Sequence, residues 1–200
     1  ANDAKLVFDG SAETNGSYII TTAGDQAHSI TLGNGADTYT GSGSGDTVVI
    51  GTAGANTITT GTGADTITAG SGADTMTGGT GNDIFAFGSA ANASGDSITD
   101  FVSANDQIGI TLDYSALLSG VVVNGVRTNT GVAGSSAAEA TFTGQRGEYV
   151  YDTTNSKLIV NANADASVSG ADFQIGINAA TTAANTIAAG EVNFTVTGTG

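Results

Sequence analysis

Between residues 32 and 86, an apolar residue recurs about every nine positions, in most cases flanked by polar neighbours. Most units end polar, apolar, polar, as in Thr38-Tyr39-Thr40. Such a triplet predicts a very short strand whose middle side chain points inward. The residues before it are glycine-rich and end in Asp or Asn, which favours a tight turn. No unit can bury its apolar residue alone, so two units should form one coil of a stacked parallel β-helix. The predicted core is Tyr39, Val48, Ile58, Ile67, Met76 and Phe85.

Short strands are also predicted outside the repeats, so we expect an all-β chain. Alternating apolar and polar residues predict them at 6–10, 17–21, 148–152, 157–161, 172–177 and 191–196. The polar residues between 152 and 157 predict a hairpin turn. We divide the chain into N-terminal strands or cap (1–22), the parallel β-roll (23–87), an acidic capping segment (88–113) and a C-terminal β-rich region (114–200).

The charge of the chain excludes several classes of function. Nineteen acidic residues face four Lys or Arg, a net charge of -15, so nucleic acids and anionic membranes are poor partners. The chain has no cysteine and one histidine, His28, which excludes thiolate and multi-histidine metal sites and leaves little room for a catalytic triad. We therefore expect no enzymatic activity. Only 12% of residues are charged and 39% are hydrophobic, which is unlike a disordered acidic chain.

The acidic residues of the repeats are regularly spaced and suggest a metal site. In a two-unit coil, Asp37, Asn56 and Asp74 stack along one edge, and Asp46, Asp65 and Asp83 along the other, about 4.8 Å apart. Carboxylates that close repel one another unless a cation lies between them. Together with glycine carbonyl oxygens they form an all-oxygen site, which suits Ca²⁺ better than zinc, copper or Mg²⁺.

The predicted ligands of several Ca²⁺ ions are these six side chains, the turns at Gly33, Gly35, Gly54, Gly61, Gly63, Gly70, Gly72, Gly79 and Gly81, and Asp96 and Asp100 as a capping site. The alternative is a metal-free β-helix whose aspartates merely favour turns. We interpret Glu13 as solvated and His28, at an Asp place, as a turn residue.

The repeats resemble those of the RTX (repeats-in-toxin) proteins. GGTGNDIFA (78–86) matches their nonapeptide Gly-Gly-x-Gly-x-Asp-x-apolar-x at every place, and TGTGADTIT and AGSGADTMT miss only the first glycine. DSITDF (96–101) and the segment 147–173 are similar to regions that follow such rolls. The resemblance implies a calcium-loaded β-roll, export by the type I secretion machinery with an uncleaved C-terminal signal, and an extracellular or cell-surface location.

Three functions are compatible with such a roll. The first is a calcium-dependent structural protein that assembles with itself into a surface layer or filament. The second is the folding and secretion module of a larger adhesin or secreted enzyme. The third is ice binding by the outward Thr-x-Thr array, although threonine is also simply a good strand former. Cell-surface polysaccharide is a further candidate partner, but five tyrosines and no tryptophan give no evident aromatic platform.

Overall fold

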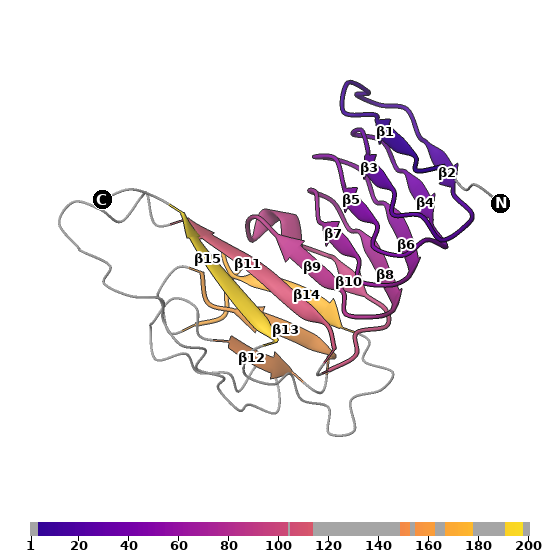
Figure 1. Ribbon diagram of the computed structural model, residues 1–200. Helices are drawn as coiled ribbons and strands as arrows, with labels where there is room; N and C mark the ends of the chain where they lie inside the picture. The colour runs from indigo at the N-terminus through magenta and orange to yellow at the C-terminus, as the bar shows by residue number, and fades with distance from the viewer. Residues whose placement is uncertain are drawn as a thin grey trace.

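A computed structural model describes residues 4–103, 105–113, 149–152, 155–162, 167–177 and 191–197. The triplets that carry the predicted inward-pointing residue form strands where the nonapeptide pattern predicts them (Figure 1). These strands are β3 (Ser29–Thr31), β4 (Thr38–Thr40), β5 (Thr47–Val49), β6 (Thr57–Thr62), β7 (Thr66–Thr68), β8 (Thr75–Thr80) and β9 (Ile84–Phe87). Before them lie β1 (Val7–Asp9) and β2 (Ile19–Thr21), at the predicted N-terminal strands.

Odd-numbered and even-numbered strands of the roll lie in different sheets, so each coil contributes one strand to each. β1, β3, β5, β7 and β9 pair in parallel in one sheet, and β2, β4, β6 and β8 in the other. The predicted parallel β-roll is therefore confirmed. Both sheets run unbroken through the boundary predicted at residue 22, because β1 pairs with β3 and β2 pairs with β4, each in parallel.

The strands that follow the repeats extend the same two sheets. They are β10 (Ser97–Ile98), β11 (Gln107–Asp113), β12 (Tyr149–Asp152), β13 (Lys157–Val160), β14 (Phe173–Ile177) and β15 (Val192–Thr197), and a 3₁₀ turn, η1 (Ala91–Ala93), precedes them. β14 pairs with β10 and β15 with β11, both in parallel. β12, β13 and β14 pair antiparallel, which includes the predicted hairpin. Much of the predicted C-terminal region, residues 114–148 and 178–190, lies outside the described residues.

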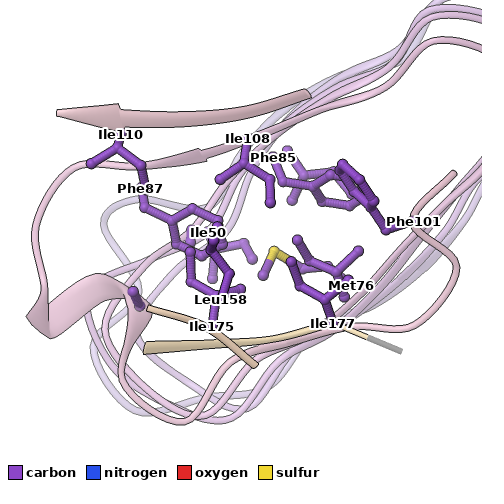
Figure 2. Packing of buried hydrophobic residues seen from close by; sticks show 14 of the residues in the cluster. Ile50, Met76, Phe85, Phe87, Phe101, Ile108, Ile110, Leu158, Ile175 and Ile177 are labelled. Carbon is purple, nitrogen blue, oxygen red and sulfur yellow. The ribbon is translucent and has the colours of Figure 1, made fainter. Parts of the chain in front are cut away.

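One hydrophobic core runs from the roll into the C-terminal strands. The six predicted core side chains are at most 1% exposed. Figure 2 shows Phe85 and Ile108 from one sheet opposite Met76 and Ile177 from the other. Leu158 joins the same cluster from β13. Within the part of the chain that is described, no helix is long and apolar enough to cross a membrane.

Candidate metal centre

The residues that precede the strands stack into two columns, one along each edge of the roll, which we call the ladders. The strand register aligns Thr38 with Thr57, and Thr57 with Thr75, so the acidic residue before each strand is also aligned. The first ladder contains Asp37, Asn56, Asp74 and Asp96, and the second Asp46, Asp65, Asp83 and Asp106. All eight side chains are buried, with at most 3% exposed.

One side-chain oxygen of each ladder residue binds the backbone of the coil before it. Asp65 Oδ1 accepts a hydrogen bond from the backbone N–H of Asp46 at 2.6 Å, and Asp83 Oδ1 accepts one from Asp65 at 2.9 Å. On the other edge, Asp96 Oδ1 accepts from the N–H of Asp74 at 2.8 Å. Because one oxygen is fixed in this way, the whole carboxylate is held in the space between two stacked turns.

The second oxygen has no such partner at five positions. Oδ2 is buried and makes no hydrogen bond within the described residues in Asp37, Asp65, Asp74, Asp83 and Asp96. An ionised oxygen removed from water without a partner costs several kcal/mol. A cation between the turns would remove that cost.

Burial also changes the acidity of these carboxyls. It raises the pKa of Asp83 to about 6 and that of Asp96 to about 7, from an ordinary value of 3.8. The pKa values of Asp65 and Asp106 rise for the same reason, and the charges of nearby carboxylates add to the effect. The negative form is thus unfavourable in these positions unless positive charge is brought to it.

The glycine turns bring backbone oxygens into the same space. A Cβ atom on Gly70 would collide with the carbonyl oxygen of Gly51 in the neighbouring turn, and one on Gly51 with that of Gly33. Gly79 and Gly81 have positive φ angles of 95° and 143°, which favour glycine. Of the predicted glycines, those at 33, 35, 54, 70 and 72 lie in turns of the first ladder, and those at 63 and 81 in turns of the second. Gly61 and Gly79 lie near the ends of β6 and β8, just before the second of these sets of turns.

At these turns the ladders bring together two kinds of possible metal ligand, the oxygens of carboxylates and the oxygens of backbone carbonyls. In the described ranges, no three acidic or histidine side chains form a metal-binding group, so a cation would need carbonyl oxygens as well. A hard cation with a flexible shell of oxygen ligands meets that requirement, and Ca²⁺ is such a cation. The unpartnered Oδ2 atoms and the close-packed turns therefore fit calcium.

Comparison with known families agrees with this chemistry. A family model of the RTX calcium-binding nonapeptide repeat, in four copies, matches residues 50–85. This segment consists of RTX calcium-binding repeats. It includes Asn56, Asp65, Asp74 and Asp83, and the same ladders continue on both sides of it. No curated protein matches the chain as a relative.

Two ladder positions within or near the RTX repeats already have protein partners. Asp46 Oδ2 accepts a hydrogen bond from the buried Tyr39 hydroxyl at 2.7 Å. Asn56 supplies an amide, whose Nδ2 donates to Asp74 Oδ1 at 2.9 Å. Of the neighbouring ladder residues Asp46 and Asp65, only Asp65 therefore has an Oδ2 without a partner among the described residues.

The two predicted capping residues, Asp96 and Asp100, lie in different surroundings. Asp96 continues the first ladder, but Asp100 lies outside both ladders and accepts backbone hydrogen bonds from Gly78 and Gly79 at 3.0 and 2.6 Å. Asp106, which we did not predict, continues the second ladder and accepts from the N–H of Asp83 at 3.0 Å. The signal was present, because Asp106-Gln107-Ile108 has the Asp–polar–apolar order of a repeat after a longer turn.

His28 begins the second ladder in place of an aspartate. Its side chain is 3% exposed, and Nδ1 accepts a hydrogen bond from the backbone N–H of Leu6 at 3.0 Å, as Asp Oδ1 does in later coils. A neutral imidazole whose Nδ1 is an acceptor carries its proton on Nε2. Nε2 is buried, has no hydrogen-bond partner among the described residues and, as an N–H, cannot bind a cation. His28 thus retains the backbone contact and supplies no metal ligand.

Proposed function

We propose that the protein is an extracellular structural protein whose β-roll folds when calcium fills the ladders. The observation that supports this most strongly is the set of five buried carboxylate oxygens without partners. Without calcium, the cost of burying these charges opposes folding. With calcium, binding and folding become one process, because the stacked turns that form the sites exist only in the roll.

We further propose that the chain leaves the cell unfolded and folds outside it. A net charge of -15 disfavours a compact state in the absence of bound cations. Extracellular calcium modules typically bind in the range of about 0.1 to 1 mM. A calcium-free chain would therefore remain extended during passage through the type I secretion machinery and fold on meeting external calcium.

Self-assembly into a layer or filament is the second part of the proposal. β1 and β2 are the outermost described strands at one end of the two sheets, and strand edges can pair with another chain. They carry two exposed apolar side chains, Val7 at 69% and Ile19 at 84%. Calcium would lower the repulsion between copies and permit contact at this end. The same edges would equally accept further coils of a longer protein, which is the alternative role as a folding and secretion module.

Electron microscopy of chelated protein, before and after addition of millimolar Ca²⁺, tests the assembly. We expect ordered sheets or fibres with Ca²⁺ and none with the same concentration of Mg²⁺. A Val7→Ser, Ile19→Ser double variant should fold with calcium but fail to assemble. Val49→Ser is the matched control, because Val49 is a partly exposed apolar residue in the middle of a sheet. Dispersed particles in every condition would contradict assembly and favour the folding and secretion module.

A further inference from the structure

The first turn of the roll differs from the repeats in length and sequence. It spans residues 10–18, between β1 and β2, and stacks on the six-residue turn 32–37 of the next coil. Tyr18 stands in the register place that aspartate occupies in the next coil, and its N–H donates to Asp37 Oδ1 at 2.7 Å. This turn therefore lacks a ladder carboxylate.

Glu13 brings a carboxylate into this turn from a different position. Its Oε1 accepts hydrogen bonds from the backbone N–H groups of Asn15 and Gly16, which fixes the side chain over its own turn. Its Oε2 is buried and has no hydrogen-bond partner in the part of the chain that the structure describes. The expectation that Glu13 is solvated is wrong for this oxygen. The arrangement repeats that of a ladder aspartate, with one oxygen held by backbone N–H groups and the other free.

The free oxygen of Glu13 faces the next turn. A Cβ atom on Gly33 would lie 2.8 Å from Glu13 Oε2 and 2.8 Å from the carbonyl oxygen of Gly10. The two oxygens thus approach the same point of the turn 32–37. Asp37 ends that turn, is 1% exposed and has a buried Oδ2 without a partner. Two carboxylates on stacked turns therefore each present one oxygen that the described residues leave unsatisfied.

We propose that Glu13 and Asp37 hold a divalent cation between the turns 10–18 and 32–37, ahead of the first nonapeptide unit. The hard oxygen donors, with the Gly10 carbonyl beside Glu13, favour Ca²⁺. This site rests on the calcium binding proposed above and adds a ligand that the repeat pattern does not contain. Because His28 supplies no ligand on the opposite edge, the first coil binds calcium on one edge only. The ion would attach β1 and β2 to the repeats.

The number of calcium ions bound by the full chain tests the site. Glu13→Gln retains an acceptor for the two backbone N–H groups and removes the charge. Asp9→Asn is the matched control, because Asp9 is an exposed carboxylate beside the same turn and accepts from Ser11 N at 3.0 Å. Equilibrium dialysis at saturating Ca²⁺ should give one ion fewer for Glu13→Gln and the wild-type number for Asp9→Asn. An unchanged number in Glu13→Gln, while the wild type binds several ions, overturns this site alone. A wild-type chain that binds no calcium overturns the proposed function as well.

Amide hydrogen exchange separates a metal ligand from a residue that only shapes the turn. In saturating Ca²⁺, Glu13→Gln should exchange faster than wild type over residues 10–21 and equally over β7 to β9. In chelator with enough trimethylamine N-oxide to fold the roll, the variant should exchange no faster than the wild type. Faster exchange of the variant in chelator, of the same size as in calcium, would assign Glu13 a purely structural role and overturn the proposal.

Discussion

Asp83→Asn should have opposite effects on stability with and without calcium. In the wild type, Asp83 Oδ1 accepts from the N–H of Asp65 at 2.9 Å, while Oδ2 is buried without a partner. An asparagine keeps the Oδ1 acceptor. Asn56 demonstrates that a ladder accommodates the amide, because its Oδ1 accepts from Asp37 N at 2.8 Å and its Nδ2 donates to Asp74. The substitution therefore removes the charge and little else.

The size of the effect without calcium follows from the pKa of Asp83. Burial raises this pKa from 3.8 to about 6, so the folded chain binds the proton more tightly than the unfolded chain. The contribution of Asp83 to folding stability is therefore greatest below pH 3.8 and falls as the pH rises through about 6. At pH 7.5 the burial of the charge costs roughly 3 kcal/mol, and at pH 4.5 about 1 kcal/mol. Asp83→Asn should stabilise the calcium-free roll by up to these amounts.

With calcium the sign reverses, because the variant loses a charged ligand. The calcium concentration at the folding midpoint should rise by about tenfold or more, a loss that is typical even of groups that only support metal ligands. Far-UV circular dichroism measures both effects, as a calcium titration and, in chelator, as a titration with the stabilising osmolyte trimethylamine N-oxide. Asp25→Asn, at an exposed carboxylate, is the control and should change neither midpoint appreciably. Two results would contradict this prediction. One is that Asp83→Asn changes the stability in the same direction with and without calcium, and the other is that it stabilises the calcium-free roll as much at pH 4.5 as at pH 7.5.

Further substitutions test the packing of turns and the occupied ladder positions. Gly70→Ala should lower the free energy of unfolding by about 1–3 kcal/mol, because the added Cβ collides with the neighbouring turn. Gly88→Ala, whose Cβ meets nothing within 4 Å, should leave the stability nearly unchanged. Equal melting temperatures of the two variants would contradict this. Tyr39→Phe leaves Asp46 Oδ2 without its hydrogen-bond donor, so the free energy of unfolding of the calcium-free roll should fall by about 1–3 kcal/mol. Adding calcium should raise the stability of this variant by more than it raises that of the wild type, and osmolyte titration can measure both values. His28→Ala removes the acceptor for the backbone N–H of Leu6 and should speed amide exchange in β1. His28→Asn, which supplies an acceptor again, should restore the slower exchange.

The period of nine residues predicted the roll because it determines which residues of successive coils lie side by side. Two units make one coil, so equivalent residues lie 18 or 19 positions apart, as the hydrogen bonds from His28 to Asp46 and from Asp46 to Asp65 confirm. The same count placed both ladders and the inward residues correctly.

Residues outside the period could not be placed by the same reasoning. Glu13 and Asp106 belong to turns longer than six residues, whose path depends on tertiary contacts. Tyr39 was predicted to lie in the core, but the pattern treats it as apolar and says nothing of where its hydroxyl finds a partner. The pairing of β14 with β10 and of β15 with β11 joins residues about 80 positions apart, and local alternation carries no information on such partners.

The central claim, that calcium folds the roll by filling the ladders, is tested most directly by following far-UV circular dichroism and bound calcium together. The chelated full chain is titrated with Ca²⁺ at pH 7.5, and a parallel titration uses Mg²⁺. We expect a cooperative gain of β-structure that coincides with the binding of several Ca²⁺ ions and is absent with Mg²⁺. A chelated chain whose spectrum already equals that of the calcium-saturated chain would contradict it.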